Sequence, residues 1–144
     1  YKRCCFCCIT MSRNKVIAYA DANGKCRVVI PTMDCALSDE AVIAKDIPTS
    51  DYSVIDPADL PSNEFRSAWQ YNHGSKTVTA DLATAKTLTT EILESKFLAT
   101  KKENADIQSI ADMKGESASL KSNPTVPYTT ITNATTISEL EALI

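Results

Sequence analysis

Four cysteines near the start of the chain are the residues best suited to chemistry, as possible thiolate ligands of a soft metal. They are Cys4, Cys5, Cys7 and Cys8, in the sequence CCFCC. Zinc sites usually combine two ligand pairs separated by a loop, and the only histidine, His73, lies far away in the sequence. We therefore predict no metal site. We interpret residues 1–13 as a disordered or extended tail, with Met11 as the natural start.

The other candidates for catalysis are the imidazole of His73 and a group of carboxylates. Nucleophilic catalysis needs a base beside the nucleophile, and His73 stands in a predicted turn without a distinctive serine or cysteine motif. The carboxylates match no calcium loop, and a solvated helix start explains them: Asp34, Asp39, Glu40 and Asp46. The three glycines form no phosphate-binding pattern. We predict no catalytic residue, no cofactor and no small-molecule ligand.

Composition limits the partners. The 144-residue chain is 44% hydrophobic, which is enough for a small core in one domain or in a head with an appendage. Its net charge is −3 and its lysines and arginines are scattered, whereas a nucleic-acid-binding protein needs a basic patch. No apolar run approaches the length of a membrane span. We expect neither nucleic acid nor membrane as a partner.

The pattern from residue 14 to residue 80 predicts a β-rich head. Two strands flank Asn23-Gly24, a pair typical of tight hairpin turns. A two-residue turn there places four apolar side chains on one face: Ile17, Tyr19, Val28 and Ile30. A short helix after Ser38, a strand over 52–55 and an edge strand over 76–79 complete the head.

The segment LPSNEFRSAWQ holds the only tryptophan of the chain. With Ser62 as N-cap, a short helix carries Phe65 and Trp69 on one side at i, i+4 spacing, and Leu60 packs against them. Arg66 falls on another side, within reach of Asp56 or Asp59. We interpret the two rings as core that covers the sheet, while an exposed Trp–Arg recognition patch remains the alternative.

Helical periodicity extends over residues 81–122, where a stripe of apolar side chains could face a partner. The stripe consists of Leu82, Ala85, Leu88, Ile92 and Ala99. A helical hairpin turning near Asn104 and one long helix both fit the pattern. We favour the hairpin, because a single helix exposes its stripe unless other subunits cover it. Residues 123–144 then form an extended connector and a terminal helix that begins with a Thr136–Glu139 capping box. The predicted fold class is α+β.

Several motifs resemble those of a family of small bacteriophage proteins of unassigned activity, which occur among structural and tail-related genes. The matching pieces are Ala44–Pro48, Tyr52 with Val54–Asp56, Asp59–Pro61, Phe65-Arg66 with Ala68-Trp69, and Thr136–Leu140. The resemblance covers roughly residues 14–144, although only Lys45–Trp69 is specific. The chain departs from the family at Ser62–Glu64, where an acidic–basic pair and one further residue are missing.

The resemblance implies a non-enzymatic structural or assembly protein, associated with the phage tail or tail fibres and located in the virion or the host cytoplasm. Its partners would be phage structural proteins or other copies of itself. In this interpretation the head is a rigid mount, and the helical stripe or the edge strand near Val78 makes the contact. The alternative is a small phage protein that binds and inhibits a host factor.

Overall fold

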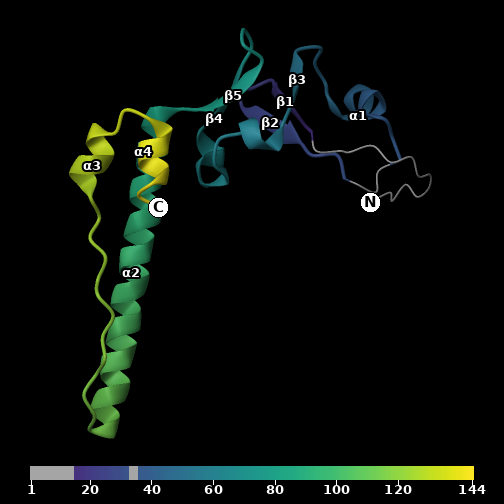
Figure 1. The fold of residues 1–144 in the computed structure, drawn as a ribbon. Helices are drawn as coiled ribbons and strands as arrows, with labels where there is room; N and C mark the ends of the chain where they lie inside the picture. Colours follow the sequence, from purple (N-terminus) through teal and green to yellow (C-terminus); the bar gives the residue numbers. More distant parts are fainter. Residues whose placement is uncertain (1–14, 33–35) are drawn as a thin grey trace. The chain divides into compact units, whose positions relative to one another are not determined.

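The computed structural model describes residues 15–32 and 36–144, which form two compact units (Figure 1). The first unit ends at Asp81 and the second begins at Leu82. The structure contains small antiparallel sheets as well as helices, so the predicted α+β class is confirmed. The predicted N-terminal tail, Met11, the four clustered cysteines and Asp34 lie outside the described residues.

The first unit contains a three-stranded and a two-stranded antiparallel sheet. The larger sheet has the order β2-β1-β3, built from β1 (Val16–Ala20), β2 (Cys26–Val29) and β3 (Tyr52–Ile55). The smaller sheet pairs β4 (Trp69–Asn72) with β5 (Thr77–Ala80). Three helical elements connect the strands: α1 (Asp39–Asp46) and the 3₁₀ helices η1 (Pro57–Asp59) and η2 (Asn63–Ala68).

The register of the first hairpin differs from the expected one by one residue. Ile17 lies opposite Val29, so it shares a face with Val29 and not with Val28 and Ile30. The cause is the Asp21 carboxylate, which accepts the backbone N–H groups of Asn23 at 2.9 Å and Lys25 at 3.0 Å. These bonds support a three-residue loop that ends with Gly24 in the left-handed region, at φ 75°. One extra loop residue reverses the faces of the second strand.

Each face of the three-stranded sheet packs against a different element. On one face, Ile17 packs with Val42 of α1 and with Ile47, which follows that helix. Ser38 caps α1, as predicted, by accepting the Ala41 N–H at 3.3 Å. The other face packs against the β4–β5 hairpin in a cluster of buried side chains: Val16, Ala18, Ile55, Trp69, Tyr71 and Val78. The aromatic side chains of β4 therefore belong to the core of the head.

The second unit is built on one continuous helix, α2 (Leu82–Lys114), so the expected helical hairpin is wrong. Asn104 does not turn the chain, because its side chain bonds a neighbouring segment and leaves the helix intact. The helix ends at Lys114, and Gly115 follows it at φ 68°, where the Glu116 N–H bonds the Ala111 carbonyl at 2.9 Å. This is a Schellman ending, which favours glycine.

The polypeptide then returns along α2 as residues 116–144, which we call the C-terminal arm (Figure 1). The arm is extended at first and ends in α3 (Tyr128–Asn133) and α4 (Ile137–Glu141). Both α3 and α4 lie against α2. Buried side chains occur on both parts of the unit: Ile131, Ala134 and Leu140 in the arm, and Ala85, Thr89 and Ala111 in the helix. The predicted capping box of Thr136 and Glu139 is confirmed. The arm covers α2 in place of the second helix of a hairpin.

Among the described helices, none combines the length and the apolar character that crossing a bilayer requires.

Candidate functional site

The segment around the only tryptophan forms a 3₁₀ helix and then a strand, not the expected α-helix. Phe65 has φ −100° and ψ 19°, which breaks a regular helical path, and Trp69 is the first residue of β4. Phe65 is 0% exposed and Trp69 is 8% exposed. The Trp69 indole N–H donates to the Ser62 carbonyl at 3.2 Å, which satisfies its buried polar atom. Both rings therefore lie in the core, although they do not share a helix face.

Arg66 takes a position that the sequence did not indicate. Its guanidinium carbon lies over the Trp69 ring, 5.9 Å from the ring centroid. The guanidinium forms no ion pair with Asp56 or Asp59. Asp56 forms an ion pair with Lys15 instead. A cation over an indole face is stabilised by the charge distribution of the ring. The structure thus combines a buried ring with an exposed arginine, and Leu60, partly buried, packs against the same cluster.

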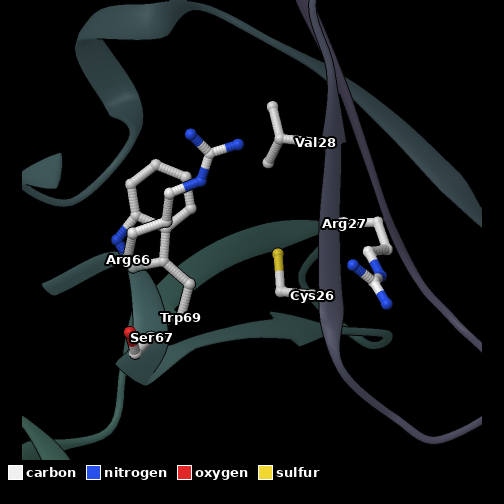
Figure 2. Close-up of a pocket in the computed structure, with 6 residues that line it drawn as sticks. All are labelled: Cys26, Arg27, Val28, Arg66, Ser67 and Trp69. Atoms are coloured by element: carbon white, nitrogen blue, oxygen red, sulfur yellow. The ribbon is translucent and has the colours of Figure 1, made fainter.

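A hollow of about 330 Å³ lies between β2 and the η2–β4 segment (Figure 2). Cys26 and Val28 point into it from β2, while Trp69, Arg66 and Ser67 form the opposite wall. Arg27 contributes to the lining, but its side chain extends from the other side of the strand (Figure 2) and pairs with Asp21 at 2.8 Å. Arg66 is therefore the cation that faces the hollow.

Among the described residues that line this hollow, Cys26 supplies the only thiol. Partial burial raises the pKa of the Cys26 thiol above its ordinary value, so the group is a neutral thiol near pH 7. Across residues 15–32 and 36–144, no three His, Cys, Asp or Glu side chains come together in a way that would hold a metal ion. The chemistry of the hollow is thus that of one guanidinium beside an apolar wall.

A second polar cluster in the head surrounds the Asp51 carboxylate. Asp51 pairs with Lys76 and with the ring nitrogen Nδ1 of His73, and it also accepts the Tyr71 hydroxyl at 3.4 Å. The Lys76 and His73 hydrogen bonds lower the pKa of Asp51 below its ordinary value. These contacts join the start of β3 to the β4–β5 loop. Asp51 and His73 stand 22 positions apart, so no sequence motif indicated the cluster.

The five residues of the predicted helical stripe do not share one environment. Ala85 is buried, Ala99 is exposed, and Leu82, Leu88 and Ile92 are partly buried. The face that the arm covers is rotated toward Thr89, which is 0% exposed, and toward Asn104. Thr89 behaves as an apolar residue here because its hydroxyl donates to the Ala85 carbonyl of its own helix at 2.9 Å. Counting threonines with the apolar residues would have indicated this face.

Large apolar side chains remain exposed on α2 after the arm has covered one face. Met113 is 78% exposed, Leu98 is 62% exposed and Ile110 is 49% exposed. Ile110 and Met113 are three residues apart and therefore neighbours on the helix surface. We call these two residues the apolar pair of α2.

No family model matches the sequence, and neither a curated protein nor a solved structure matches it.

Proposed function

We propose that the protein is a non-enzymatic bacteriophage structural or assembly protein, associated with the tail or tail fibres, that acts through protein–protein contacts. The observation that carries the contact function is the apolar pair, Ile110 and Met113, which stays in water on a helix whose other face is covered. The phage assignment rests on the resemblance of the Lys45–Trp69 segment and of Thr136–Leu140 to the phage family.

The geometry of the second unit supports a contact role. A helix of 33 residues extends about 50 Å at 1.5 Å per residue. The residues Ala85, Thr89 and Ala111 of α2 are buried, whereas Ile110 is 49% exposed and Met113 is 78% exposed. Removing such side chains from water stabilises an association by about 25 cal/mol for each Å² of apolar surface. The exposed apolar pair is thus available for contact with a partner protein or with another copy of the chain.

Mass spectrometry of purified phage particles tests the assignment directly. A structural protein is expected among the particle proteins at a reproducible copy number. A small inhibitor of a host factor is expected in infected cells and absent from particles. The second result would overturn the structural assignment.

The contact surface is tested with the double variant Ile110→Ser and Met113→Ser. We expect it to keep its helical circular dichroism but to lose incorporation into particles, because the apolar pair is removed without any change in the covered face. Leu98→Ser is the matched control, since it removes an exposed apolar side chain about three turns or more away along α2. Normal incorporation of the double variant would contradict a contact through this pair.

A further inference from the structure

The strand β2 lies at the edge of its sheet, next to the hollow that Cys26 and Val28 line. In the described part of the chain, β2 pairs only with β1, so alternate backbone N–H and C=O groups along Cys26–Val29 have no strand partner. Such an edge can accept another extended chain through main-chain hydrogen bonds. The hollow that holds Cys26 and Val28 lies beside this edge.

No carboxylate of the described residues pairs with the guanidinium of Arg66. By contrast, Lys15, Arg27 and Lys76 all have carboxylate partners. The Trp69 ring holds the guanidinium on one side, which reduces the rotamer freedom that a ligand would have to restrict. An arginine held in this way is prepared to bind a carboxylate with two parallel hydrogen bonds.

The size and lining of the hollow are compatible with a single side chain that carries a carboxylate. At about 330 Å³ it stands at the lower limit of ligand pockets, which is too small for a large organic ligand. Val28 offers an apolar wall for methylene groups, and the Cys26 thiol carries no negative charge that would repel a carboxylate. A glutamate side chain combines methylenes with a terminal carboxylate and matches this arrangement.

We propose that β2 and the hollow beside it bind an extended segment of a partner protein, with a glutamate side chain of that segment bound by Arg66 against Trp69. The partner's backbone bonds the free edge of β2 while its carboxylate enters the hollow. This site is in the head and does not depend on the apolar pair of α2, so its failure would leave the proposed function untouched.

The test uses the full chain and a panel of acetylated, amidated five-residue peptides with β-branched residues around a central glutamate. Each peptide has an analogue with glutamine at the centre. Calorimetry measures affinity, and the emission of Trp69, the only tryptophan, reports whether binding occurs at the hollow. We expect binding of glutamate peptides to be about 10- to 100-fold tighter than that of glutamine peptides, as for a charged hydrogen-bonded pair.

Two variants locate the carboxylate. Arg66→Gln is expected to reduce affinity for glutamate peptides to that for glutamine peptides, and Arg66→Lys to restore it only in part, because lysine lacks the planar fork. Lys45→Gln is the matched control, as it removes one positive charge from an exposed position on α1. Circular dichroism confirms that each variant is folded before its affinity is compared.

Three results would overturn the proposal. If N-acetylglutamate amide binds as tightly as the peptides, the site takes a free carboxylate and the strand contact is wrong. If no glutamate peptide binds at millimolar concentration, the assignment of the hollow is wrong. The assignment is also wrong if a glutamate peptide binds without changing the Trp69 emission and binds the Arg66→Gln variant as tightly as it binds the wild type.

Discussion

Asn104 in the second half of α2 and Lys121 in the C-terminal arm are joined by two hydrogen bonds. The Asn104 amide donates to the Lys121 carbonyl at 2.8 Å, and its oxygen accepts the Lys121 N–H at 2.8 Å. The same amide also donates to the Asn123 side chain at 3.1 Å. One side chain thus satisfies the backbone of an extended segment that has no strand beside it, and it fixes the arm at this point of the helix.

We expect Asn104→Ala to release this part of the arm, at a cost of about 1–3 kcal/mol for the two lost hydrogen bonds. Native-state hydrogen exchange should show faster exchange of the Lys121 amide. Ser109→Ala, at an exposed position of α2, is the control and should leave that exchange rate unchanged. Equal exchange in wild type and Asn104→Ala would mean that other contacts hold the arm.

Ala85 and Ala99 offer a matched pair on α2, because one is fully buried and the other is exposed. We expect Ala85→Leu to lower the free energy of unfolding by about 1–3 kcal/mol, since the added atoms have no space beneath the arm. Ala99→Leu should change it by less than about 0.5 kcal/mol. Urea unfolding followed by helical circular dichroism measures both. A similar effect of the two substitutions would contradict the position of the arm.

Gly115 and Gly74 form a second matched pair. Gly115 adopts φ 68°, where a Cβ atom is strained although nothing lies within 4 Å of it. Gly115→Ala is expected to destabilise the protein by about 1–2 kcal/mol. Gly74 has no left-handed φ, and a Cβ there would meet Asn72 Oδ1 at an ordinary 3.6 Å. Gly74→Ala should therefore be nearly neutral, and thermal unfolding of both variants checks the difference.

The Asp51 carboxyl is expected to titrate below its ordinary pKa of 3.8, because Lys76 and then His73 donate hydrogen bonds to the charged form. A carboxyl whose pKa is lowered by folding stabilises the folded state above 3.8, and this stabilisation is lost as the pH falls through the lowered pKa. Carboxyl NMR titration measures the shift. Lys76→Gln should move the pKa upward more than His73→Gln does, and the opposite order would contradict the ranking of the two bonds.

Much of the head could be predicted from sequence, with two exceptions: the loop length of the first hairpin, and the segment around Trp69, which forms η2 and β4 in place of the expected helix. Alternation, Asn23-Gly24 and the Ser38 cap indicated β1, β2, β3, β5 and α1. The faces of β2 were predicted wrongly, because Asp21 accepts two backbone N–H groups and enlarges the turn by one residue. A pattern of apolar residues does not indicate whether a side chain will bond the backbone of the loop and so change the loop length.

The second unit and the hollow depended on tertiary contacts that no local pattern contains. Periodicity indicated a helical region, but Asn104 was interpreted as a turn residue although it binds the returning arm. Phe65 and Trp69 were expected in the core and are buried there, whereas Arg66 was assigned to Asp56 or Asp59. Asp56 pairs with Lys15 and not with Arg66. Lys15 and Asp56 stand 41 positions apart in the sequence, so no local pattern indicated this ion pair.

The return of the arm also determines how the second unit would respond to a mechanical load. Contacts of Lys86 with Thr132 and of Lys96 with Ile144 bring the end of the arm back to the first half of α2. Tension between Leu82 and Ile144 would therefore peel the arm from the helix one contact after another, beginning at α4. Because only a few hydrogen bonds would bear the load at any moment, the arm would separate at a lower force than if all its contacts had to break together.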